Sequence, residues 1–203
     1  MSSGVQPVAP SLPNWDRLRQ EPDEVAIGIE TTTRIVEGAG ERVEPVGALR
    51  PRLDTLAERI AARDVDGTTA AAQALAGLGP GLTPLGDDIL VGALHALWAV
   101  EADGELRDSL CGAILEGSAG RTTTLSTSWI RAAARGEAGR DWLPLLAALP
   151  TCSTKCTEAA TIRVLSTGHS SGAASLVGFL VTWRAVGARS SVVSHQSPPP
   201  APK

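Results

Sequence analysis

Apolar residues recur every three or four positions through most of this chain, which predicts a protein built mainly of helices. Between residues 49 and 60 the apolar positions on one helical face are Leu49, Leu53, Leu56 and Ile60. The same spacing, with polar and glycine-rich breaks between segments, predicts further helices over residues 68–78, 83–102, 105–117, 126–135, 142–149, 154–166 and 171–186.

Residues 24–47 show a different pattern, made of short β-branched runs. These runs cover residues 25–29, 32–36 and 42–46, and the last two are separated by Gly38-Ala39-Gly40. Such runs between turn signals favour strands. We therefore expect an α-rich, α+β fold, in which a multi-helix domain carries a small N-terminal β element.

Composition divides the chain into four parts. Residues 1–14 and 190–203 are rich in Ser and Pro, so we expect disordered tails there. Residues 15–47 form the β-containing segment, and residues 48–189 form the helical domain. A length of 203 residues suits one compact domain.

Charge and cysteine content exclude several classes of protein. The net charge is −4 and the basic residues are scattered, so we expect neither a nucleic-acid surface nor a membrane-binding patch. No apolar run reaches the roughly 20 residues of a membrane span. The cysteines, Cys111, Cys152 and Cys156, form no CxxC pair. We expect a cytoplasmic protein with reduced thiols and no structural metal site.

Residues 77–88 (GLGPGLTPLGDD) combine four glycines, two prolines and paired acids immediately before an apolar helix. A glycine-rich loop that ends at a helix N-terminus can present backbone N–H groups to an anion. We expect Gly79, Gly81 and Thr83 to bind a small anionic substrate. Asp87 and Asp88 are candidate catalytic carboxylates, although acids in a first helical turn often only stabilise the helix. Asp88 shares a helical face with Gly92 and His95.

A second cluster, Ser166 to Leu176, also runs from a Gly-Ser turn into an apolar helix. Ser170, Ser171 and Gly172 could bind the substrate, and His169 could carry a proton near neutral pH. The alternative is a histidine that is merely on the surface or near a helix cap.

A third cluster, Gly120 to Trp129, is dense in hydroxyl groups and again precedes a helix. Arg121 could bind a carboxylate through two hydrogen bonds, with Thr123 beside it. The alternative is an ordinary Ser/Thr cap and a solvated arginine. If the three helix starts converge, they build one anion-binding pocket.

These three segments resemble the motifs of a bacterial family, long described as a domain of unknown function, that includes the AllH-type subunit of oxamate carbamoyltransferase. The resemblance is carried by GLGPGLTPLGDDILVG (Gly77 to Gly92), by Arg121 to Ser128 with the following AAARG, and by GHSSGAASLVG (Gly168 to Gly178). Two residues depart from the pattern: Leu85 replaces a small polar residue, and Ala174 replaces an acid that the family often has.

The resemblance implies a component of a carbamoyl-transfer system in allantoin (purine) catabolism, which moves a carbamoyl group between an oxamate-like amide and phosphate with the help of other subunits. Asp87 or Asp88 would orient the amide or act as a base, His169 would carry a proton, and Arg121 would neutralise an anion. Two alternatives stay open. Asp87 and Asp88 could hold Mg²⁺ in a hydrolase or phosphoryl-transfer enzyme, or the chain could be a non-catalytic ligand-sensing or assembly subunit.

Overall fold

The computed structural model describes residues 12–151 and 153–193, and in this part of the chain helices and their connecting loops are present but no strand. The elements are α1 (Trp15–Gln20), α2 (Pro22–Glu37), η1 (Gly40–Arg42), α3 (Glu44–Gly47), α4 (Arg50–Ala61), α5 (Val65–Leu75), α6 (Leu85–Val100), α7 (Gly104–Ser118), α8 (Thr124–Ala134), α9 (Leu143–Ala148), η2 (Leu149–Thr151), α10 (Thr154–Leu165) and α11 (Ser171–Val193). The eight predicted helices lie close to where the apolar spacing placed them.

The predicted N-terminal β element is wrong, because helix α2 occupies most of that segment. Pro22 begins the helix at a position where no backbone N–H is needed. Val25, Ile29 and Val36 lie on its buried face, with spacings of four and seven residues that fit a helix, whereas a strand would place Ile29 and Val36 on opposite faces. The hydroxyl of Thr32 donates to the carbonyl of Gly28 at 2.9 Å. Burial of this face against the rest of the domain outweighs the weak strand preference of β-branched residues.

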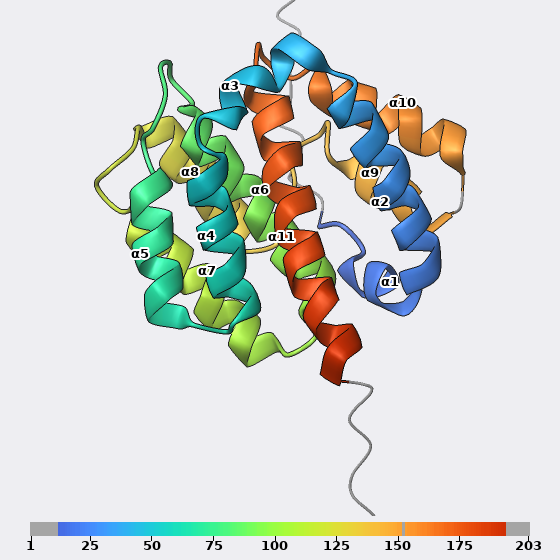
Figure 1. Ribbon diagram of the computed structural model, residues 1–203, viewed down its shortest axis with the longest axis horizontal. Helices are drawn as coiled ribbons and strands as arrows, with labels where there is room; N and C mark the ends of the chain where they lie inside the picture. Colours follow the sequence, from blue (N-terminus) through green and yellow to red (C-terminus); the bar gives the residue numbers. More distant parts are fainter. Residues whose placement is uncertain (1–11, 152, 194–203) are drawn as a thin grey trace, which may run out of the picture.

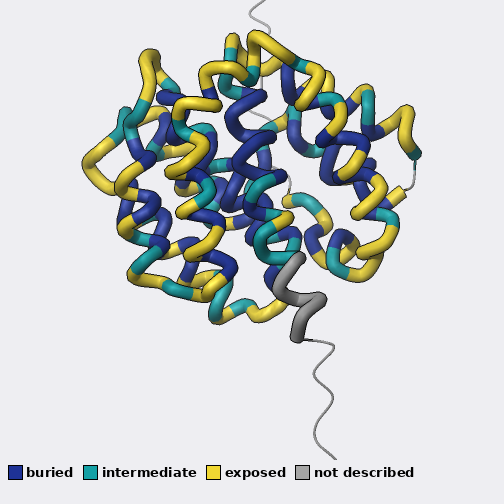
Figure 2. Tube along the Cα trace, in the orientation of Figure 1, coloured by how far each residue is buried: buried dark blue, intermediate teal, exposed yellow. Residues whose placement is uncertain are grey.

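Helices α6 and α11 cross at the centre of the molecule, with α4, α5 and α7 on one side and α1, α2, α9 and α10 on the other (Figure 1). Figure 2 shows that most of the first half of α11 is buried. The backbones of the two helices touch, since a Cβ atom on Gly92 would overlap the carbonyl oxygen of Ser175, and one on Gly178 would overlap that of Ile89. This contact fixes the starts of α6 and α11 relative to each other.

The predicted tails fall largely outside the described residues. Asn14 accepts a hydrogen bond from the backbone N–H of Arg17 and so caps α1, and α11 continues to Val193. Within the described part of the chain, every helix is too short or too polar to cross a lipid bilayer.

Candidate functional site

The starts of α6, α8 and α11 converge at one end of the molecule. The hydroxyl oxygens of Thr83, just before α6, and Ser171, the first residue of α11, are 3.1 Å apart. The Thr123 hydroxyl, just before α8, donates to the carbonyl of Leu82 at 2.7 Å. The segments singled out in the sequence are therefore neighbours in space, and the loop before α6 contacts both of the others.

The loop before α6 contains two glycines at positions where neighbouring backbone leaves no room for a side chain. Gly77 has a φ of +73°, and a Cβ atom there would overlap the carbonyl oxygen of Arg121. Gly79 has a φ of +109°, and its Cβ would lie 2.9 Å from the backbone nitrogen of Leu85. Both conformations are unfavourable for residues with a side chain. Leu85 itself is buried, so it helps to pack the loop and offers no polar group to a ligand.

Several first-turn N–H groups of α6 already have acceptors within the loop. Gly86 donates to the carbonyl of Leu78 at 2.9 Å, and Asp87 and Asp88 donate to that of Pro84 at 2.9 and 3.2 Å. These amides are not available for a ligand in this conformation. Anion binding by Gly79, Gly81 and Thr83, all on the exposed or half-exposed part of the loop, stays a prediction.

Asp87 joins two of the converging segments. The side chain is 1% exposed, and one carboxylate oxygen, Oδ1, accepts the backbone N–H of Gly77 at 2.8 Å. The other oxygen, Oδ2, accepts a short hydrogen bond from the hydroxyl of Thr122. Because both oxygens bind groups of the protein, Asp87 holds the loops before α6 and α8 together. Thr122 is the partner that sequence reasoning missed, since nothing distinguished it within a run of hydroxyl residues.

Asp88 points to α11 and is the more unusual carboxylate. The Ser171 hydroxyl donates to it, and burial raises the pKa of Asp88 to about 7, while the Ser171 hydrogen bond acts in the opposite direction and the charge of Asp87 raises the pKa further. Its oxygen Oδ2 is buried and accepts no hydrogen bond from the described residues. The hydroxyl oxygen of Ser171 also lies 3.1 Å from that of Thr83, and either hydroxyl can be the donor of this contact. We call Thr83, Ser171 and Asp88 together the hydroxyl relay.

The other predicted residues of the Gly-His-Ser cluster lie around this relay. His169 is exposed on the loop between α10 and α11, and Ser170 is half-buried beside it. Gly172 is buried, and a Cβ atom there would overlap the carbonyl oxygen of Val164, so this glycine allows α11 to start close to α10. Ala174 is wholly buried and apolar.

Arg121 is exposed and contacts α5. Its Nε lies 3.1 Å from the side-chain oxygen of Gln73 when that amide is oriented to accept from it. Thr123 accepts the backbone N–H of Ser126 at 3.1 Å and so caps α8. Carboxylate binding by Arg121 and substrate binding by Thr123 stay predictions.

His95 belongs to the core and does not share a cleft with Asp88. It is 1% exposed, its ring lies 4.8 Å from that of Trp142, and Nε2 lies 3.3 Å from the carbonyl oxygen of Glu137. Burial lowers the pKa of His95 to about 4, so the ring is neutral at physiological pH. The backbone of Ser175 fills the space beside Gly92, between Asp88 and His95.

The two adjacent acids do not form a shared metal site within the described residues, because Asp87 faces Thr122 and Asp88 faces Ser171. No group of three His, Cys, Asp or Glu side chains gathers there in ligand-like geometry among the residues described. Mg²⁺ binding through one of the two acids stays a prediction.

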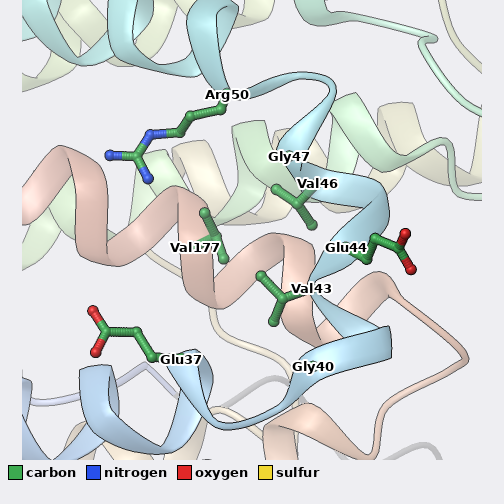
Figure 3. Close-up of a pocket in the computed structure, with 8 residues that line it drawn as sticks. All are labelled: Glu37, Gly40, Val43, Glu44, Val46, Gly47, Arg50 and Val177. Atoms are coloured by element: carbon green, nitrogen blue, oxygen red, sulfur yellow. The ribbon is translucent and has the colours of Figure 1, made fainter.

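A hollow of about 320 Å³ lies elsewhere, between α3, α4 and α11. Val43, Val46 and Val177 lie around it together with Glu37 and Arg50 (Figure 3). None of the predicted site residues lines this hollow, so its shape gives no support to the predicted chemistry.

Comparison with known proteins identifies the family but provides no structural relative. No solved structure matches the chain. The family model described as oxamate carbamoyltransferase subunit AllH matches residues 75–183, which is more than half of the chain. The matched span begins at Leu75, ahead of the glycine-rich loop, and includes the Arg121 segment and the start of α11. The chain therefore belongs to the AllH family of oxamate carbamoyltransferase subunits.

Proposed function

We propose that this chain is a subunit of a carbamoyl-transferring enzyme and that Asp88, Ser171 and Thr83 handle the amide of a small oxamate-like substrate. The observation that carries the proposal is Asp88. A half-buried carboxylate with an unpaired oxygen and a pKa of about 7 lies where two helix starts meet. Burying such a group is unfavourable, and perturbed carboxyl groups of this kind are typical of acid–base sites.

The proposed chemistry is the transfer of a carbamoyl group between an amide nitrogen and phosphate. In the direction of transfer to oxamate, the amide nitrogen forms a bond to the carbamoyl carbon, and the bond from that carbon to the phosphate oxygen breaks. Phosphate leaves with the electrons of that bond. The proton lost by the nitrogen goes to the Asp88 carboxylate, whose pKa of about 7 suits a base at neutral pH. Ser171 orients the carboxylate, and Thr83 completes the relay.

The substrate's negative charges need donors besides this relay. Arg121 would bind a carboxylate or phosphate after turning away from Gln73, and the N–H groups of Gly79 and Gly81 would add hydrogen bonds. His169, exposed on the loop before α11, would exchange protons with solvent.

The proposal is tested with Asp88→Asn in the enzyme reassembled with its other subunits. The rate of carbamoyl transfer should fall at least ~100-fold, because a general base usually accelerates a reaction by about that factor or more. Glu105→Gln is the control, because Glu105 is an exposed acid in the first turn of α7. The wild-type rate should rise with pH through an apparent pKa near 7.

Two outcomes would contradict the proposed role of Asp88. Full turnover by Asp88→Asn would favour the alternative of a subunit that assembles the enzyme without doing chemistry. A rate that rises through some other pKa would assign the proton transfer to another group. A thermal-shift screen with oxamate, carbamoyl phosphate and phosphate adds a binding measurement, since a ligand at 100 times its Kd stabilises by roughly 2.7 kcal/mol.

A further inference from the structure

Three large apolar side chains are exposed next to the candidate site. Leu82, on the loop before α6, is 76% exposed, and Leu125 and Trp129, on α8, are 45% and 49% exposed. We call these residues the rim patch. Single exposed apolar residues are common, but several that adjoin a candidate site mark an interaction surface.

The rim patch is continuous with the hydroxyl relay. The carbonyl of Leu82 accepts from Thr123, two residues before Leu125, at 2.7 Å. Leu125 and Trp129 are one helical turn apart and so lie on the same face of α8. In the other direction, Leu82 is followed by Thr83, which contacts Ser171 at 3.1 Å. A protein that covers the rim patch would therefore also lie close to Thr83 and Ser171.

The charge of the site indicates which charged side chains a binding partner would have to supply. Asp87 and Asp88 are both carboxylates, and no Lys, Arg or His among the described residues forms an ion pair with either of them. The basic residue of the converging loops, Arg121, faces Gln73. The substrates of the proposed reaction carry both a carboxylate and a phosphate, so Arg121, after turning away from Gln73, would bind one of them and leave the other without a cation.

We propose that the rim patch binds a different subunit of the same carbamoyltransferase, through an apolar face that also carries an arginine or lysine close to Thr83 and Ser171. This inference rests on the proposed function, because it concerns the same site. Membership of a family described as a subunit gives the chain a partner of another kind.

The experiment measures complex formation and needs no turnover. The full chain is mixed with each of the other oxamate carbamoyltransferase subunits of its own organism, purified separately, and Kd values are measured by calorimetry or analytical ultracentrifugation. Leu82→Asp and Trp129→Glu should each weaken the complex at least ~10-fold, as expected for apolar side chains at the centre of an interface. Ile162→Asp is the control, because Ile162 is 54% exposed on α10, outside the converging segments.

The substituted side chains are exposed, so circular dichroism and melting should match the wild type and show that the variants fold. The proposal is overturned if no complex forms, if the rim variants bind as tightly as the control, or if the isolated chain forms a homodimer that these variants disrupt. A complex that depends on the rim patch, but whose turnover does not depend on Asp88, would sustain this interface and refute the proposed chemistry.

Discussion

Replacement of Asp88 by Asn should make the folded protein more stable at alkaline pH. The pKa of Asp88 is raised from 3.8 to about 7, first of all by burial. The unfolded chain therefore loses this proton near pH 4, whereas the folded chain keeps it until about pH 7. Between these values the folded state binds more protons, so stability falls as pH rises and the full penalty is present above pH 7.

The magnitude follows from the size of the shift. Each pKa unit corresponds to about 1.4 kcal/mol, so the shift of roughly 3 units costs the wild type up to about 4 kcal/mol above pH 7. Asn retains an oxygen that can accept from Ser171, but its amide N–H₂ takes the place of the unpaired Oδ2, at a cost of about 1 kcal/mol. We expect Asp88→Asn to be about 2 to 3 kcal/mol more stable than the wild type at pH 8 and about equal to it near pH 4.5.

Urea unfolding followed by circular dichroism at the two pH values measures this difference. Equal m-values in both proteins would show that the unfolded states expose similar surface. His95 titrates in the same range, but it is present in both proteins and its contribution cancels in the difference. A variant less stable than the wild type by the same amount at both pH values would refute the reasoning, because it would show that the Asp88 carboxylate is not destabilised by burial.

Four further substitutions test the structural roles assigned above. Asp87→Ala should lower the free energy of unfolding by about 3 kcal/mol, since it leaves a buried N–H and a hydroxyl unpaired, and urea melts measure this loss; an unchanged midpoint would refute the joining role. Gly178→Ala should cost about 3 kcal/mol by pushing α11 away from the Ile89 carbonyl, again seen in urea melts. The pKa of His95 is lowered from 6.5 to about 4, so its contribution to stability is lost as pH falls through that window, by up to roughly 3 kcal/mol; His95→Phe should unfold with a flatter pH dependence. Ala174→Asp should cost about 4 kcal/mol or more by burying an unpaired carboxylate, and a folded variant of wild-type stability would show that a partner for that acid exists nearby.

The apolar spacing was enough to predict the helices from residue 49 onward, because those segments have clear buried faces and Gly, Pro or Ser/Thr residues at their ends. It failed for α2, where Val25, Ile29 and Val36 fit a helix but are mixed with Thr residues that favour strands. What decides that segment is distant in sequence: the Thr32 hydroxyl lies 3.2 Å from that of Thr161, and Arg184 donates to Thr33 at 2.9 Å. Local propensity carries no information about such contacts.

In the candidate site, too, the sequence alone could not predict which contacts individual side chains make. The sequence indicated that Asp87 and Asp88 lie at a helix start, but two adjacent acids look alike in a sequence. Only the neighbours separate them: Thr122 and Gly77 occupy both oxygens of Asp87, whereas Ser171 leaves one oxygen of Asp88 unpaired. The pairing depends on how α6, α8 and α11 are placed, which follows from tertiary packing.

The glycine contacts between α6 and α11 also limit how this protein can move. Two packed helices can slide past each other in a conformational change because the side chains between them change rotamers. At Gly92 and Gly178 those side chains are missing, and backbone lies directly on backbone. The pair should therefore behave as one rigid body, so that any movement of the converging segments would come from the loops at residues 77–84 and 166–170. Hydrogen exchange should be slow along the crossing and fast in those loops.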